Sequence, residues 1–340
     1  MKYRKPQPVP AARPLAATAA IAATVAMTAM ATFASDAIGQ PAWPSKPIRM
    51  VIAFSPGGTS DTLGRILGQR LSETLGQPVV VDSRPGASGM IGADVTARAA
   101  PDGYTLMHAY IGQFSVNPSL YAKMTHDPAR DFTPISLVAT APQLVVVPPE
   151  LPVKSIRDLT ALAREKPGQL NFGTGGSGTL GFVAAELYQT LTGVKMVHVS
   201  YKGTVLAQND LLANRVQVMF SDMPIALPQA NAGKLRAIAV TSGKRSALLP
   251  SMPTVAEGGV PGYELLAWWG LVGPRGLPAP IVGRLHAELV RIHALQDIRE
   301  RYEGLGVEPA TNTPAQFGAF MREDAERFSK LLKTAGVKAD

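Results

Sequence analysis

A strand, a glycine turn and a helix follow one another around residues 54–61, and this order constrains the fold more than any other feature. The apolar run 50–53 precedes the turn, and aliphatic residues at helical spacing follow it over 63–75. Paired glycines let the backbone approach a ligand, and a helix start favours an anion. The segment is therefore a candidate carboxylate or phosphate cradle. The alternative is a plain turn with a capped helix.

The first residues are typical of a secretory signal peptide. Basic residues precede the uncharged, Ala-rich run 15–31, and small residues follow it at Ala34 and Ala37. Cleavage after Ala34 would remove residues 1–34, and cleavage after Ala37 is the second possibility. We therefore expect export to the periplasm. The alternative is an uncleaved anchor, for which the run is marginal in length.

Charge and cysteine content narrow the classes of function. The formal net charge of +8 falls to about +4 to +5 without the signal segment, and the remaining charges are scattered. Scattered charge and only 6% aromatic residues argue against a nucleic-acid surface. A modest positive surplus suits an acidic small molecule. The chain has no cysteine, so its fold needs no disulfide, and roughly 300 residues can bury ample core without one.

Short apolar strands alternate with helix-period segments, which predicts an α/β fold with largely parallel sheets. The predicted strands are 48–54, 79–82, 105–109, 143–147, 170–173, 197–199, 216–220, 235–241 and 268–272. Prolines after Val147 and the Pro/Gly-rich passage 242–262 indicate two lobes. We assign 43–146 with 267–340 to the first lobe and 147–266 to the second. Two chain crossings make a hinge, and the cleft between the lobes is the expected ligand site.

A second glycine-rich turn, residues 173–179, also follows a predicted strand and opens a predicted helix. It matches G-x-G-x-x-G, but His-Val-Ser at 198–200 stands where a dinucleotide site needs an acidic residue. Thr179 also replaces the second glycine of a nucleophile elbow. The five histidines form no pair at metal-binding spacing and have no cysteine beside them. We expect no metal and no cofactor.

Three further positions could line the cleft. Ser88 lies in the turn 84–89 and could donate its hydroxyl, although a structural turn fits equally well. Tyr201 follows the strand 197–199 and could supply a wall and a hydroxyl. Asp222 ends another strand. It either caps a helix before Pro224 or faces the cleft, where it would disfavour a second ligand anion and favour a hydroxyl, amine or amide donor.

These loops together make the chain recognisable. From about Trp43 to the C-terminus it resembles the Bug-type solute-binding proteins of tripartite tricarboxylate transporters. The segments that carry the resemblance, in order, are 43–48, 54–61, 76–81, 84–89, 100–104, 117–121, 201–204 and 253–257. One departure concerns the second-lobe strand end, which often reads Phe-Asp in the family and reads Phe220-Ser221-Asp222 here.

The resemblance implies a two-lobed periplasmic-binding-protein, or Venus flytrap, architecture without catalytic function. It implies a receptor that closes on a carboxylate through the loops 54–61 and 173–179 and delivers an organic acid to permease subunits. We expect a monomer and no nucleic-acid partner. The predicted ligand-binding residues are Phe54, Gly57, Gly58, Thr59, Ser88, Ser177, Gly178, Thr179, Tyr201 and Asp222. The alternatives are a ligand-binding partner of a sensor protein and a periplasmic hydrolase using Ser177.

Overall fold

The computed structural model describes residues 1–8 and 43–337. Residues from Lys46 onward form one compact unit, and the segment that ends at Ser45 is separate from it. Residues 1–8 are exposed and have no regular secondary structure. The predicted signal-peptide run and both cleavage positions lie outside the described residues. Within the described ranges, no helix is both long and apolar enough to cross a bilayer.

A six-stranded mixed sheet organises the first part of the compact unit. Its order is β11-β4-β10-β3-β1-β2. The strands are β1 (Ile48–Ile52), β2 (Val79–Ser83), β3 (Thr105–Tyr110), β4 (Phe132–Ala141), β10 (Ala267–Pro274) and β11 (Glu308–Pro309). β1 runs parallel to β2 and β3, whereas β10 runs antiparallel to β3 and β4, and β11 antiparallel to β4. β1 and β10 are almost entirely buried, as expected for strands in the middle of a covered sheet.

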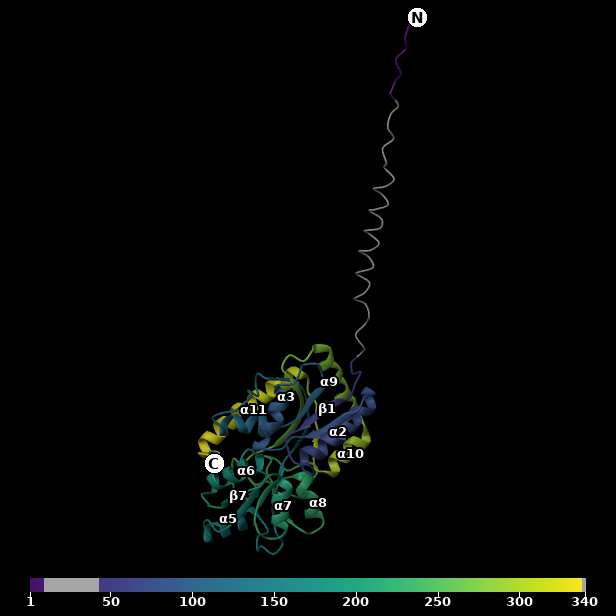
Figure 1. The fold of residues 1–340 in the computed structure, drawn as a ribbon. Coiled ribbons are helices and arrows are strands. Elements are labelled where there is room, and N and C mark those ends of the chain that lie inside the picture. Colours follow the sequence, from purple (N-terminus) through teal and green to yellow (C-terminus); the bar gives the residue numbers. More distant parts are fainter. Residues whose placement is uncertain (9–42, 338–340) are drawn as a thin grey trace. The chain divides into compact units, whose positions relative to one another are not determined.

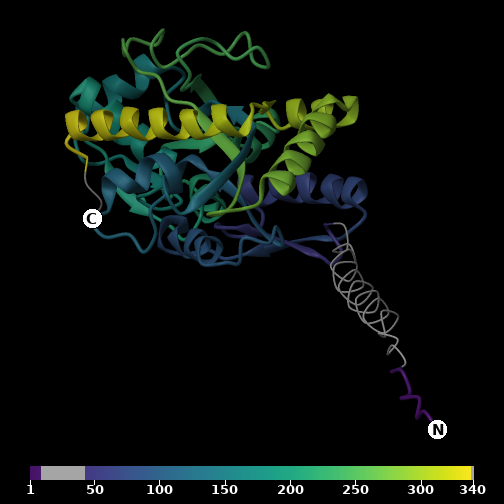
Figure 2. The same ribbon diagram turned by 90° about the horizontal axis from the view of Figure 1, so that it is seen from above.

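Helices from both ends of the chain accompany this sheet. They are α2 (Thr59–Leu75), α3 (Met90–Ala97), α4 (Asn117–Leu120), α9 (Ala279–Ala294), α10 (Gln296–Gly304) and α11 (Pro314–Ala335), with a 3-10 turn η2 (Ala87–Gly89) and a π-helical turn η3 (Gly112–Val116). Figure 1 shows α2, α9 and α10 grouped with β1, and α2 contacts both α9 and β1. α11, the long yellow helix of Figure 2, contacts β4 and η3.

The remaining strands form two smaller sheets. The three-stranded sheet has the order β8-β5-β9 and the two-stranded sheet pairs β6 with β7. These strands are β5 (Gln143–Val147), β6 (Asn171–Thr174), β7 (Val197–Ser200), β8 (Met219–Asp222) and β9 (Arg236–Val240). The helices α5 (Ile156–Glu165), α6 (Leu180–Thr192), α7 (Thr204–Leu212) and α8 (Met223–Asn231) accompany them. Leu144, Val146, Leu211 and Met219 belong to their shared apolar core.

Strand directions correct one expectation from the sequence. The sheets are mixed and not largely parallel, because β5 pairs antiparallel with both β8 and β9, and β10 does so with β3 and β4. A run of apolar residues locates a buried strand, but it does not specify with which distant strand it pairs or in which direction. β4 itself was not predicted. It contains Pro134, a residue that argues against an inner strand, and a register shift between Leu271 and Val272 lies beside it.

The chain passes from one sheet group to the other between Ala141 and Gln143, and it returns at Ala267. We call the part built on the six-stranded sheet the first lobe and the part built on the two smaller sheets the second lobe. The fold is α/β in both. The exact lobe boundaries remain a prediction from the proline pattern.

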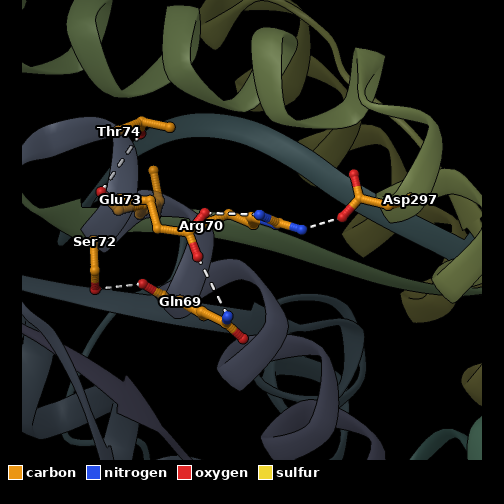
Figure 3. Close-up of polar contacts among 8 residues, drawn as sticks. Gln69, Arg70, Ser72, Glu73, Thr74 and Asp297 are labelled. Carbon is orange, nitrogen blue, oxygen red and sulfur yellow. Dashed lines mark hydrogen bonds and ion pairs between the residues drawn. The ribbon is translucent and has the colours of Figure 1, made fainter.

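A polar contact on the first lobe fixes α2 against α10. The Arg70 guanidinium lies between Glu73, one turn further along α2, and Asp297 at the start of α10 (Figure 3). Ser72 adds a link to the next strand, since its hydroxyl accepts a hydrogen bond from the Val79 N–H at 2.7 Å. These contacts hold the C-terminal half of α2, and its N-terminus is directed to the candidate site.

Candidate functional site

Two adjoining cavities lie where the loops of both lobes meet. The first has a volume of about 200 Å³ and the second about 500 Å³. The polar and backbone lining of the first cavity comes from Gly58, Thr59, Ser60, Tyr110, Gln143, Thr174, Thr179, Gly181, Thr204 and Asp222. Five residues line both cavities, namely Phe54, Ser55, Gly175, Lys202 and Gly203. The Ser55 hydroxyl donates to the Lys202 carbonyl at 3.0 Å, which ties the two lobes together at the shared wall.

Three helices, α2, α6 and α7, begin at the first cavity. Their N-cap residues are Gly58, Thr179 and Gly203, and none of the three makes a side-chain hydrogen bond to the helix it opens. By contrast, Ser155 and Thr313 cap α5 and α11 with their side chains. The first N–H groups of a helix have no partner within it. Uncapped starts therefore leave donors, and the positive end of three helix dipoles, available to a ligand.

Local sequence explains why these helix starts reach the cavity. Gly203 has a φ of +133°, which only glycine adopts without strain, so the chain turns sharply from β7 into α7. Gly181 lies in the first turn of α6, and a Cβ on it would stand 2.4 Å from the Phe220 carbonyl oxygen. Glycine at this position lets α6 lie directly against the end of β8.

The predicted glycine donors are partly occupied within the protein. The Gly57 N–H donates to the Asp61 carboxylate at 3.0 Å, and the Gly58 N–H lies 3.4 Å from the Ser55 carbonyl. Asp61 also pairs with Arg65 at 2.9 Å. Asp61 therefore stabilises the start of α2 from within its first turn. Gly58 lines the first cavity, whereas Gly57 lines neither cavity.

The predicted Thr residues also differ in their roles. Thr179 lines the first cavity, but its hydroxyl donates to the Gly176 carbonyl at 2.7 Å and so closes its own turn. Thr59 is 3% exposed and lines the same cavity. Next to it, Ser60 accepts a hydrogen bond from the Trp269 indole at 3.2 Å, which anchors the first turn of α2 to β10.

Asp222 forms the buried polar end of the first cavity. Its Oδ1 accepts from Gln143 Nε2 at 3.0 Å and from the Tyr110 hydroxyl at 3.4 Å. Burial raises the pKa of the carboxyl, and the hydrogen bonds from Gln143 and Tyr110 together with the nearby Thr59 hydroxyl oppose this rise. Asp222 is the N-cap residue of α8, but its side chain makes no capping hydrogen bond there. Of the two predicted orientations, the structure therefore has the one that faces the cavity.

Aromatic rings close the apolar side of the site. Phe54 lines both cavities and meets the Tyr110 ring edge-on, with ring centroids 5.5 Å apart. Tyr110 in turn packs against Trp269 at 5.6 Å. Phe220 and Leu206 line the first cavity from the second lobe. The site thus combines uncapped helix starts with apolar walls.

The other predicted residues belong to the second cavity or to the contact beside it. Ser88 and Ser177 line the second cavity. The Ser88 hydroxyl accepts from the Gly178 N–H at 3.2 Å and lies 2.9 Å from the Tyr121 hydroxyl. Tyr201 lines the second cavity, while its hydroxyl donates to Asp210 at 2.7 Å. Its hydroxyl thus bonds within the protein.

Sequence reasoning missed Tyr110 and Gln143. Tyr110 ends β3, one residue beyond the predicted strand 105–109, and Gln143 begins β5, which was predicted only as a strand. A polar residue at the end of an apolar strand is the signal that could have singled them out. Thr204 lies in the segment 201–204, which carries the family resemblance, but it was not among the predicted ligand-binding residues. Within the described ranges, no group of three His, Cys, Asp or Glu side chains could hold a metal ion.

Comparisons with known proteins agree on one family. The family model described as "Tripartite tricarboxylate transporter family receptor" matches residues 63–337. Protein BugT of Bordetella pertussis is 33% identical over 297 residues, which cover 87% of this chain and 91% of BugT.

Two solved structures with bound acids are also similar to this chain. R. palustris Rpa4515 with adipate has a TM-score of 0.85 and 37% identity, covering 88% of this chain and all of that one. MatC (Rpa3494) from Rhodopseudomonas palustris with bound malate has a TM-score of 0.81 and 30% identity, covering 85% of this chain and all of that one.

Proposed function

Because the chain belongs to the tripartite tricarboxylate transporter receptor family, we propose that it captures a small organic acid in the periplasm and delivers it to the permease subunits of such a transporter. Membership confirms the resemblance to Bug-type solute-binding proteins. Similar proteins have been solved with adipate and with malate. The chain's own cavity, at about 200 Å³, is smaller than the roughly 300–1,000 Å³ of pockets for drug-sized ligands. A small acid fits this size.

The observation that carries the proposal is the convergence of three uncapped helix starts on one cavity. The residues that begin α2, α6 and α7 line it together. Their N–H groups donate to the ligand carboxylate, and the helix dipoles stabilise its charge. Lys202 is the cationic side chain among the lining residues, and it is exposed. Backbone donors therefore supply most of the recognition.

Closure of the two lobes completes the site. The Ser55–Lys202 contact and the Ser88–Gly178 contact both join the first lobe to the second. Bringing the lobes together removes water from the cavity, which strengthens hydrogen bonds to a charged acceptor. We propose that these contacts form when the hinge closes on the acid. The proposal includes no catalytic step, and a monomer suffices for it.

Isothermal titration tests this function directly. Mature protein lacking residues 1–37 is titrated with succinate, L-malate and adipate, and with succinamide and adipamide as uncharged matches of the same chain length. We expect at least one acid to bind, and its diamide to bind at least about tenfold more weakly, because charge-assisted hydrogen bonds are the stronger ones. Absence of binding by all three acids and by their amine-bearing analogues L-aspartate and 6-aminohexanoate, or equal binding of acid and diamide, would overturn the proposal.

The intact mass of the protein in the periplasmic fraction tests the predicted export. Periplasmic protein should have an intact mass that corresponds to cleavage after Ala34 or Ala37, because signal peptidase cuts after small residues. Protein that retains residues 1–34 in the periplasmic fraction would contradict the export route.

A further inference from the structure

We propose that the ligand carries a protonated amine besides its carboxylate, and that Asp222 and Gln143 bind this amine. The inference rests on the proposed function, because it concerns the same cavity. It narrows the ligand from organic acids in general to amino carboxylates.

The orientation of each polar group at this end of the cavity follows from hydrogen-bond chemistry. Gln143 and Asp222 are direct partners in the antiparallel pairing of β5 with β8, so their side chains share a face. An ionised carboxylate only accepts hydrogen bonds. The group of Gln143 that lies 3.0 Å from Asp222 Oδ1 must therefore be its NH₂, and its carbonyl Oε1 must point elsewhere.

Two acceptors are left for the ligand. Gln143 is 2% exposed and lines the first cavity, and its buried Oε1 has no hydrogen-bond partner among the described residues. Asp222 is 8% exposed and lines the same cavity. The hydrogen bonds from Gln143 and Tyr110 both end on Oδ1, and the Thr59 hydroxyl is a further donor near the carboxyl. A carboxylate can accept about four hydrogen bonds, so Oδ2 retains capacity.

A count of donors selects the ligand group. A hydroxyl has one proton and can satisfy one acceptor, whereas an ammonium group has three and can satisfy both. A primary amide also has two donors but no charge. Burial raises the pKa of Asp222 and so penalises its ionised form, and an adjacent cation offsets that penalty. A second ligand carboxylate would meet two acceptors and a like charge. These arguments favour the ammonium group.

The competing interpretation is that Asp222 serves only the closed structure. Tyr110 belongs to the first lobe and Asp222 to the second, so their contact also joins the lobes. In that case the carboxylate would matter for closure but would not distinguish one ligand from another. Selectivity between matched ligands separates the two interpretations.

The test uses isothermal titration of the mature protein with two matched sets. L-aspartate, L-malate and succinate share a four-carbon chain and differ by an ammonium, a hydroxyl or a hydrogen on one carbon. In the second set, 6-aminohexanoate replaces one carboxylate of adipate by an ammonium. We expect the amine of at least one set to bind at least about tenfold more tightly than its amine-free counterparts, since a charged pair in a desolvated site adds about that much or more.

Asp222→Asn then tests the assignment to this residue. It keeps the shape and removes the charge, and we expect it to lower amine affinity and bring the preference within about threefold. Tyr110→Phe removes one bond to Asp222 but keeps the carboxylate, so the ratio between amine and amine-free ligands should persist even if all affinities fall. If Asp222→Asn fails to fold, the ratio of the affinities for amine and amine-free ligands, measured on the parent protein, still tests whether the ligand carries an amine.

Three outcomes would overturn the inference. Amines that bind no better than their counterparts in both sets would exclude an ammonium ligand while leaving the carboxylate receptor intact. An amine preference that survives Asp222→Asn would show that Asp222 serves the closed structure only. Failure of every compound, adipate included, would overturn the proposed function together with this inference.

Discussion

The Ser88 hydroxyl accepts a hydrogen bond from the Gly178 N–H at 3.2 Å, across the boundary between the two lobes. Ser88 has a φ of +53°, a left-handed conformation that is uncommon for a residue with a side chain, and it lies beside Ala87 with a φ of +47°. Strained backbone of this kind gathers at ligand clamps and switch regions. The turn therefore belongs to the closing contact.

Ser88→Ala should weaken ligand binding while leaving the fold intact. The substitution leaves the buried Gly178 N–H without its acceptor in the closed state, at a cost of about 1–3 kcal/mol. Titration of the acid that binds the parent protein measures the loss. Ser177→Ala is the matched control, because Ser177 lines the second cavity only, and its affinity should stay within about threefold. Equal affinities for Ser88→Ala and the parent would show that the contact does not support closure.

A pair of glycine substitutions tests the close packing of α6 on β8. Gly181→Ala places a Cβ 2.4 Å from the Phe220 carbonyl oxygen, and we expect it to lower the free energy of unfolding by about 1–3 kcal/mol. Gly283→Ala, at an exposed position of α9 with no atom within 4 Å of the new Cβ, should raise it by about 0.5–1 kcal/mol. Urea unfolding measures both. If both substitutions changed the free energy of unfolding in the same direction, α6 would not depend on glycine at position 181 to pack against β8.

Two buried histidines predict a pH dependence of stability. Burial lowers the pKa of His108 to about 3 and that of His293 to about 4, whereas an unfolded histidine titrates near 6.5. Below about pH 6.5 the unfolded chain binds protons that the native protein does not. Stability therefore falls as pH decreases, by about 1.4 kcal/mol per pH unit for each histidine.

Unfolding of the parent and of His293→Leu between pH 7 and pH 5 isolates one contribution. The variant should show a shallower decline, because one proton fewer is taken up on unfolding. Identical slopes would mean that His293 is protonated in the native protein as readily as in the unfolded chain.

Lys202→Met tests whether backbone donors bind the acid. The side chain is exposed, and its carbonyl, which accepts from Ser55, remains in the variant. Exposed charge pairs contribute about 0–1 kcal/mol, so the dissociation constant should rise by about fivefold or less. A loss of more than about thirtyfold would assign the charge recognition to Lys202 and not to the helix starts.

Local order was predictable from the sequence, and long-range geometry was not. Both glycine turns do lie between a strand and a helix, as β1 with α2 and β6 with α6, because apolar periodicity and glycine act over a few residues. Which N–H groups are free also depends on distant contacts, since Ser88 accepts the Gly178 N–H from 90 residues away in the chain.

Pairing between distant strands also exceeds what a pattern can specify. Gln143 and Asp222 are 79 residues apart in the chain, and only the register of β5 with β8 places them opposite one another. Tyr110 reaches Asp222 from the other lobe. The sequence indicated the loops of the candidate site, whereas the polar end of the cavity required the tertiary structure.

A titration followed by amide NMR tests the central claim most directly. The ¹⁵N-labelled mature protein is titrated with whichever of succinate, L-malate or adipate binds it, and the backbone amides are followed. We predict that the amide protons of Ser60, Gly181 and Val205, at the starts of α2, α6 and α7, shift downfield because they donate to the carboxylate. Shifts confined to Gly86, Ala87 and Ser177 around the second cavity would contradict the account.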